Sequence, residues 1–254
     1  MDNHVLDNPH IFLDEIMRQA QESEIIRLSM HVREGKPLYT FPAKDEQVKI
    51  LPKSAVSLSL LMWGDQVLCA TNRNKINLNN QLRQAYNLPF EPQVGDKIIN
   101  LHNEWDILST DGNPLTNGII GTIKQMQIGH WTYPFWLRNE KLTVPILTAT
   151  ISGDNENEEY QMLAFDYHEL LSGEASLTLR EEYRLNKSDY AVPLHCNYGY
   201  AITTWKAQGS EWDKVVLFEE PGWPREFQER KKYLYTGITR AAEKLVVIKK
   251  DDLL

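Results

Sequence analysis

The stretch YLYTGITRAAEKLVVI (233–248) decides the fold, because a helical pattern in it runs directly into a short apolar segment. Leu234, Ile238 and Ala241 recur at the spacing of one helical face, and we expect a helix over about 232–242. KLVVI (244–248) has the length and β-branched content of a buried strand. A helix that feeds such a strand is typical of an α/β layer.

Arg240 falls inside this expected helix and carries a planar, permanently charged group suited to phosphate oxygens. The plain interpretation is a core helix with an exposed arginine. Thr236, Gly237 and Thr239 are unusual for such a helix, however, and would let another backbone or a ligand approach closely. The pattern alone leaves both interpretations open.

The same alternation of helix and strand occurs elsewhere in the chain. Ser23 can cap a helix with one apolar face that ends at Gly35. QVLCAT (66–71) has strand character and precedes a helix with a stripe of leucines, and VVLF (215–218) predicts a further buried strand. Strands that alternate with helices at this spacing predict a parallel sheet.

The pattern changes between about Val94 and Arg184, where short apolar runs are separated by turn signals. Asn117-Gly118 is a strong hairpin signal. We therefore expect a small all-β barrel inserted into the α/β layer, since insertions are tolerated at loops whose two ends lie close together. Aromatic residues are dense within it, and each could be a stacking platform for nucleic-acid bases or part of the barrel core. These residues are Trp131, Tyr133, Phe135 and Trp136.

Composition excludes some classes of protein. The chain has 254 residues, 42% of them apolar, and a net charge of -8, which argues against binding nucleic acid by bulk charge alone. The charge is uneven, with acids concentrated at 154–182 and bases concentrated from 225 to 250. There is no apolar run of membrane-spanning length, and the two cysteines do not form a framework for disulfides. A reduced cytoplasmic location fits these features.

Two stretches near the C-terminus resemble superfamily-one DNA helicases of the RecD/Dda-like branch. The stretch 233–248 resembles motif VI, of general form Y-x-G-I-T-R-A. The resemblance implies that Arg240 is catalytic and reaches the γ-phosphate of ATP, as a finger that accelerates phosphoryl transfer by roughly 10³-fold or more. YAITTWKAQGSEWDKVVLF (200–218) is similar to motif V, usually written T-x-H-K-[SA]-Q-G-S-E, with Trp205 where the family usually has histidine.

Motif V contributes to two sites in the family. Its glycine and glutamate side approaches the nucleotide, and its threonine and histidine side contacts the DNA backbone. The resemblance therefore assigns three residues to ATP, namely Gln208, Gly209 and Glu211, and three to DNA, namely Thr204, Trp205 and Lys206. Trp205 could instead pack internally. Without the resemblance, Q-G-S-E (208–211) is only a turn between a helix and a strand.

Two upstream stretches add weaker matches. The stretch 12–35 resembles motif IV, which implies that Arg18 is a second γ-phosphate ligand, although it could equally pair with Glu15 or Glu22. The strand at 66–71 would end in polar residues that face DNA, with Thr71 and Asn72 as candidates. The stretch 94–123 looks like the SH-three-like barrel that is inserted in the second motor domain of this branch.

The resemblance predicts an α/β fold, that of a RecA-like second motor domain of the P-loop NTPase type, with the barrel inserted. We expect the motor domain to span 1–91 and 188–254, and the barrel 92–187. The bound molecules would be ATP, Mg²⁺ and single-stranded DNA, and we identify no metal-ligating residue.

The chain has no G-x-x-x-x-G-K-[ST] loop, which would cradle the β- and γ-phosphates. We therefore expect a truncated or split product that needs an N-terminal RecA-like motor domain to hold Mg²⁺ and that hydrolyses no ATP alone. Translocation from 5′ to 3′ follows from the branch. Two alternatives remain: a non-catalytic module that binds single-stranded DNA or a repair partner, and a subunit of an exonuclease V-type helicase–nuclease that acts in DNA repair and recombination beside nuclease subunits.

Overall fold

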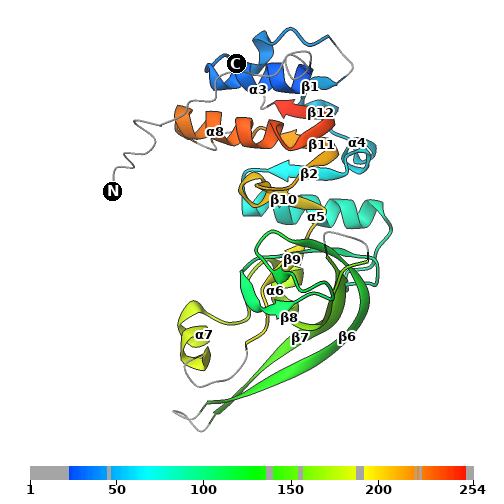
Figure 1. The fold of residues 1–254 in the computed structure, drawn as a ribbon, viewed down its shortest axis with the longest axis vertical. Helices are drawn as coiled ribbons and strands as arrows, with labels where there is room; N and C mark the ends of the chain where they lie inside the picture. The colour runs from blue at the N-terminus through cyan, green and yellow to red at the C-terminus, as the bar shows by residue number, and fades with distance from the viewer. Residues whose placement is uncertain are drawn as a thin grey trace.

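The computed structural model describes residues 23–44, 47–135, 140–153, 157–186, 192–220, 222 and 225–249. These residues form two five-stranded sheets, which follow one another along the long axis of the molecule, and one two-stranded ribbon (Figure 1). Arg18 and the rest of residues 12–22, the first part of the motif IV stretch, lie outside the described residues.

The first sheet has five parallel strands in the order β1-β12-β11-β2-β10. Its strands are β1 (Val48–Pro52), β2 (Gln66–Cys69), β10 (Ala201–Thr203), β11 (Trp212–Phe218) and β12 (Ala241–Lys249). The mixed α/β class with a parallel sheet is therefore confirmed. The strands come from both ends of the chain, so the segment between β2 and β10 leaves the sheet and returns to it.

Helices cover both faces of this sheet, as its nearly continuous apolar strands require. One face packs against α3 (Glu24–Arg33) and α8 (Phe227–Ile238), and the other against α4 (Leu58–Trp63) and α5 (Asn72–Ala85). The Ser23 hydroxyl caps α3, and Gly35 adopts a φ of 81° just beyond its end, as the sequence predicts. Three short 3₁₀ helices complete this part of the chain: η1 (Leu38–Thr40), η2 (Lys53–Ala55) and η3 (Thr204–Ala207).

The second sheet is antiparallel, in the order β8-β7-β6-β3-β9. Its strands are β3 (Lys97–Asn100), β6 (Ile120–Phe135), β7 (Glu140–Ser152), β8 (Glu159–Asp166) and β9 (Cys196–Tyr198). Leu194, two residues before β9, pairs with Phe165 in β8 through hydrogen bonds of 2.7 and 2.8 Å to the neighbouring residues. The segment that leads into β9 thus bridges to β8 at the other edge of the sheet, so the two edges approach each other and the sheet has the form of a small barrel. A separate ribbon is formed by β4 (Glu104–Leu108) and β5 (Pro114–Leu115).

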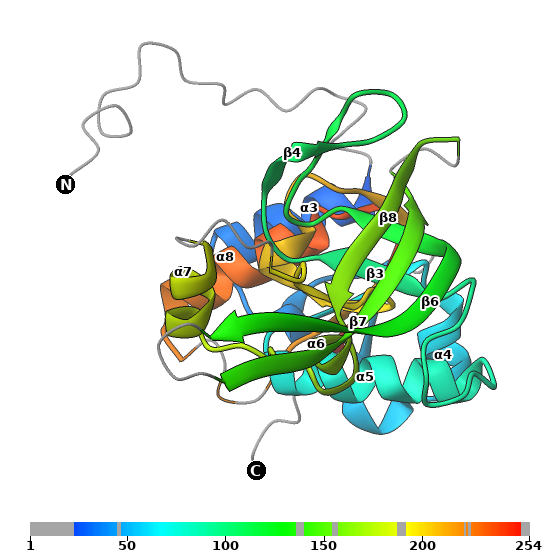
Figure 2. The same cartoon turned by 90° about the horizontal axis from the view of Figure 1, so that it is seen from below.

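The barrel differs in three ways from the expected set of short strands. The strands β6 and β7 pair over most of their length and project as one long hairpin (Figure 2). Two helices, α6 (Tyr167–Ser172) and α7 (Leu179–Asn186), accompany the strands, and α7 packs with the hairpin in a cluster that includes the fully buried Tyr133. Asn117-Gly118 forms a turn between strands of two different sheets and is not a hairpin, because β5 pairs with β4 and β6 with β3.

The two sheets meet along α5 and β9. Residues 196–198, which the sequence places with the motor domain, pair with β3 of the antiparallel sheet. Arg83 on α5 forms a buried ion pair with Asp96, which precedes β3, and Tyr200 donates to the same carboxylate at 2.8 Å. These contacts fix the barrel against the parallel sheet.

Candidate nucleotide and nucleic-acid site

Arg240 lies just beyond α8, which ends at Ile238, and not inside the helix as expected. Its guanidinium group donates to the carbonyl oxygens of Thr236, Ser210 and Ala207 at 3.1, 3.0 and 3.5 Å, and to the Thr239 hydroxyl at 3.2 Å. In the described part of the chain it makes no ion pair with a carboxylate. The half-buried cation is therefore held only by neutral oxygens.

The 208–211 loop lies beside this arginine. Gly209 has a φ of 92°, and an added Cβ would meet no atom within 4 Å, so the loop is open at this point. Gln208 and Glu211 are exposed, and the amide of Trp212 donates to the Arg240 carbonyl at 2.9 Å. The structure thus brings together the four nucleotide candidates that it describes, at the edge where β11 and β12 begin.

Gly237 was predicted to allow the close approach of a backbone or ligand. An added Cβ at Gly237 would lie 2.6 Å from a methyl carbon of Leu217 on β11. The glycine therefore serves the packing of α8 on the sheet.

Thr71 and Asn72 lie at the opposite edge of the sheet, where β2 ends. Thr71 caps α5, and its hydroxyl donates to a carboxylate oxygen of Glu220 at 2.8 Å. The other oxygen of Glu220 accepts from the amide of Ala70 at 2.7 Å and from that of Thr71 at 3.2 Å. Asn72 is exposed at the first turn of α5. The sequence did not single out Glu220, although its place two residues after a buried strand could have indicated it.

The three remaining DNA candidates lie on η3 and have different surroundings. Thr204 is fully buried, and its hydroxyl donates to the Cys69 carbonyl at 3.4 Å, so the expected contact with a DNA phosphate is not supported. Trp205 is 38% exposed and packs edge-on against Tyr233 with ring centroids 6.3 Å apart. Part of this indole is therefore internal and part faces solvent.

Lys206 joins the parallel sheet to the barrel. Its ammonium group donates to the Leu101 carbonyl at 2.9 Å and to the Asn117 side-chain oxygen at 2.5 Å. Burial lowers the pKa of this lysine from its usual range, although the Glu169 carboxylate acts in the opposite direction. The sequence predicted a phosphate donor, and the structure shows a lysine bound to two loops of the barrel.

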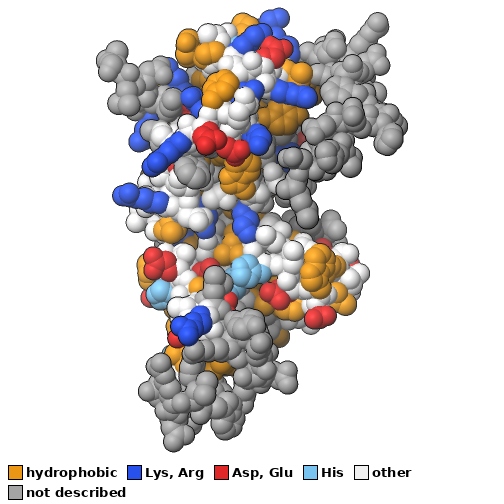
Figure 3. Space-filling model, turned by 90° about the vertical axis from the view of Figure 1, so that its left-hand side faces the viewer, with side chains coloured by type: hydrophobic (Ala, Val, Ile, Leu, Met, Phe, Trp, Pro, Cys, Tyr) orange, Lys and Arg blue, Asp and Glu red, His pale blue; other side chains and the backbone are white. Residues whose placement is uncertain are grey.

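In Figure 3, lysine and arginine side chains concentrate over the α/β half of the visible face. Among the described residues there is no cluster of three metal-ligating side chains, and within the same ranges no helix is long and apolar enough to cross a membrane.

Comparison with known proteins gives a family for one part of the chain. Residues 198–248 match the family described as UvrD-like helicase C-terminal domain. No curated protein matches the chain.

Several solved structures match the chain. Pif1 helicase from Candida albicans is 15% identical with a TM-score of 0.46, over 92% of this chain and 55% of that one. Pif1 helicase from Bacteroides in complex with ADP-AlF3 and single-stranded DNA is 14% identical with a TM-score of 0.42, over 92% of this chain and 50% of that one. The chain thus spans about half the length of these two structures. The segment that contains both the 208–211 loop and Arg240 is similar to a UvrD-like helicase C-terminal domain.

Proposed function

We propose that this chain is the second motor half of an ATP-dependent, superfamily-one DNA helicase of the RecD/Dda-like branch. The observation that carries the proposal is the contact between Arg240 and the carbonyl oxygens of Ala207 and Ser210. This contact joins the two stretches that resemble motifs V and VI at one edge of the sheet, and residues 198–248, which match the family, include both stretches.

On the nucleotide side, Arg240 would stabilise charge on the γ-phosphate as phosphoryl transfer proceeds. The residues fit this role, because the guanidinium has no acidic partner in the described ranges and its neutral oxygen partners can be exchanged for phosphate oxygens. The open backbone at Gly209 and the exposed carboxylate of Glu211 suit a phosphate and a ribose hydroxyl, with Gln208 beside them. Arg18 would be the second γ-phosphate ligand.

On the DNA side, we propose that Trp205, Thr71 and Asn72 contact single-stranded DNA. Trp205 is partly exposed, and an exposed indole face can stack on a base. Thr204 would act from inside by fixing the start of η3 on β2. Lys206 would hold the barrel, which we propose to be the SH-three-like insertion, close to the DNA strand.

The proposed motor needs a partner, because ATP in such motors lies in the cleft between two RecA-like domains. The missing half would supply the phosphate-binding loop and most ligands of Mg²⁺. ATP would close the cleft and hydrolysis would reopen it, and these cycles would move the motor along the strand in the 5′-to-3′ direction. The chain alone should therefore show no DNA-stimulated ATP hydrolysis. An immunoblot of source cells that shows a band well above 29.5 kDa would indicate that both halves are fused.

The decisive test measures DNA-stimulated ATP hydrolysis by the chain joined to its motor partner. Arg240→Ala should lower kcat by about 10³-fold while nucleotide binding persists. Arg33→Ala removes an exposed arginine from α3 and is the matched control, expected to leave kcat unchanged. Equal rates for Arg240→Ala and the control would refute the proposed role of Arg240. Clear turnover by the chain alone that Arg240→Ala abolishes would instead refute the proposed need for a second motor domain.

A further inference from the structure

One tyrosine in α8 carries a hydroxyl that hydrophobic packing alone does not require. Tyr233 is fully buried, and its hydroxyl donates to the Phe218 carbonyl at the end of β11 at 2.5 Å. The Thr204 side chain is a second hydrogen-bond partner of the same hydroxyl. A phenylalanine ring would fill the same space, so the hydroxyl adds a directional link between α8 and the elements beside it.

The helix α8 and the segment that follows it are held to η3 at two points. At one end of η3, the ring of Trp205 lies edge-on against Tyr233, and Thr204 bonds to its hydroxyl. At the other end, the Arg240 guanidinium donates to the Ala207 carbonyl at 3.5 Å. Trp205 belongs to the proposed DNA side and Arg240 to the nucleotide side. Each side of the proposed motor therefore has its own contact between the same two elements.

The two contacts differ in what ATP would do to them. In the proposed motor, Arg240 exchanges neutral oxygen partners for the γ-phosphate, so its contact with Ala207 is given up. The hydroxyl of Tyr233 lies in the core, where a phosphate does not replace its partners. Tyr233 is about one and a half helical turns from Ile238, the last residue of α8. The contact that persists is thus close to the end of the helix that leads to Arg240.

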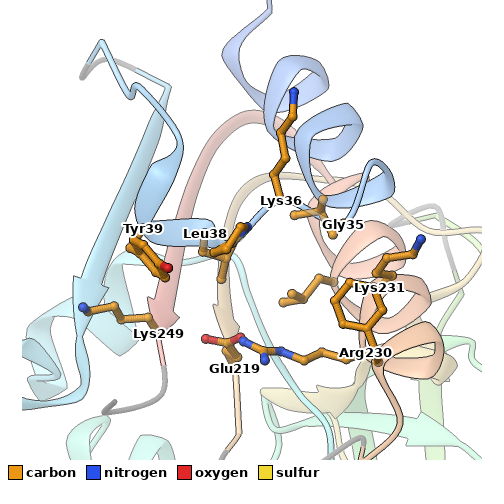
Figure 4. A pocket seen from close by; sticks show the side chains of 12 residues that line it. Gly35, Lys36, Leu38, Tyr39, Glu219, Arg230, Lys231 and Lys249 are labelled. Atoms are coloured by element: carbon orange, nitrogen blue, oxygen red, sulfur yellow. The ribbon is translucent and has the colours of Figure 1, made fainter. Parts of the chain in front are cut away.

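The segment that follows β11 joins the start of α8 to a second DNA candidate. Glu219 forms an ion pair with Arg230 in the first turn of α8, and Figure 4 shows the two side chains directed at each other. The next residue, Glu220, accepts from the Thr71 hydroxyl at 2.8 Å. The carbonyl that Tyr233 binds comes directly before these two carboxylates. The strand end that carries Thr71 is therefore connected to the same helix.

We propose that Tyr233 is a positioning residue, through which a DNA strand bound at Trp205 sets the position of Arg240. A strand that shifts η3 would shift the Tyr233 ring and hydroxyl with it, and α8 would carry the movement to Arg240 as a rigid element. The hydroxyl would thus make ATP hydrolysis depend on bound DNA. This inference rests on the proposed function, because it needs DNA at Trp205 and phosphate at Arg240.

The test measures ATP hydrolysis by the chain joined to its motor partner, without DNA and with saturating oligothymidylate. Tyr233→Phe keeps the ring and removes only the hydroxyl. The stimulation by DNA should fall by about five-fold, which corresponds to one hydrogen bond between neutral groups. The KM for ATP and the DNA concentration that gives half-maximal stimulation should stay close to those of the unmodified protein, because neither ligand reaches the core.

Two further variants accompany Tyr233→Phe. Thr204→Val removes the other side-chain partner of the hydroxyl and should lower the stimulation in the same direction. The matched control is Tyr133→Phe, which removes the hydroxyl of another fully buried tyrosine, in the cluster between the barrel hairpin and α7. Thermal unfolding of each variant sets an assay temperature at which all of them are folded.

A double-mutant cycle tests whether Tyr233 and Trp205 act on the same step. Trp205→Ala should itself lower the stimulation by DNA. If the effect of Trp205 passes through Tyr233, the variant Trp205→Ala/Tyr233→Phe should lose no more stimulation than Trp205→Ala alone. Independent effects would multiply, which would place the double variant about five-fold below Trp205→Ala.

The results separate this inference from the proposed function. If Arg240→Ala lowers kcat while Tyr233→Phe behaves like the control, the motor function stands and the role of Tyr233 is overturned. The same follows if the losses in the cycle multiply, or if Tyr233→Phe lowers the rate equally with and without DNA, as a structural defect would. An absence of DNA-stimulated hydrolysis in the unmodified protein would refute the proposed function, and this inference with it.

Discussion

Replacing Arg83 by methionine should loosen the junction between the parallel sheet and the barrel. Arg83 is 4% exposed and Asp96 is fully buried, and their side chains form two parallel hydrogen bonds of 2.9 and 3.0 Å. The guanidinium also donates to the carbonyl oxygens of Phe90 and Glu91, each at 2.9 Å. It lies 4.1 Å from the centre of the Tyr198 ring.

The size of the effect follows from the charge that would remain. Methionine fills much of the same space, so the loss is mainly that of a partner for a buried carboxylate, which costs about 3–5 kcal/mol. Hydrogen bonds from Tyr200 and the Gln93 amide still stabilise Asp96, which favours the lower part of this range. At about 2–4 °C per kcal/mol, the melting temperature should fall by about 6–20 °C.

The assay is urea unfolding followed by tryptophan fluorescence, together with thermal melting. Arg73→Met removes an exposed arginine from the same helix and should change stability by less than about 0.5 kcal/mol. Adding Asp96→Asn to Arg83→Met should recover part of the loss, because the unpaired charge is then gone. The reasoning is refuted if Arg83→Met costs no more than Arg73→Met, or if the double variant is less stable than the single one.

Three further predictions concern packing, pH and cysteine reactivity. Gly237→Ala should destabilise the chain by about 1–3 kcal/mol in urea unfolding, because the new methyl group would crowd Leu217 on β11. Alanine has the better helix propensity, so a variant that is more stable than the unmodified chain would contradict this expectation. A hydrogen bond with Glu169 at 2.6 Å raises the pKa of the buried His195 from 6.5 to about 9. The resulting stabilisation of the folded chain is on the order of 3 kcal/mol; it should be complete below about pH 6.5 and lost as the pH rises through about 9. His195→Gln should abolish this pH dependence in thermal unfolding measured across that range. Burial raises the pKa of both thiols, Cys69 and Cys196, so neither should react with a thiol reagent until the chain is unfolded in denaturant, and labelling of the native chain would contradict their burial.

Local sequence patterns were sufficient for the elements that depend on neighbouring residues. Ser23 and Gly35 set the limits of α3 as expected, since capping and positive φ act within one turn. The apolar run that contains Val215 predicted β11 as a buried strand because its residues must be covered on both faces. The spacing of the stretches that resemble motifs V and VI could likewise be found without a structure.

Contacts between residues distant in sequence were decided by the tertiary structure alone. Lys206 belongs to a pattern that predicts a DNA contact, yet its ammonium reaches Leu101 and Asn117, about a hundred positions away in the chain. Thr204 is buried because β10 pairs with β2, and Glu220 reaches Thr71 because β11 lies beside β2. Periodicity and motif spacing determine which side chains face the core. They do not determine which strands become neighbours, and strand order decides which polar groups become partners.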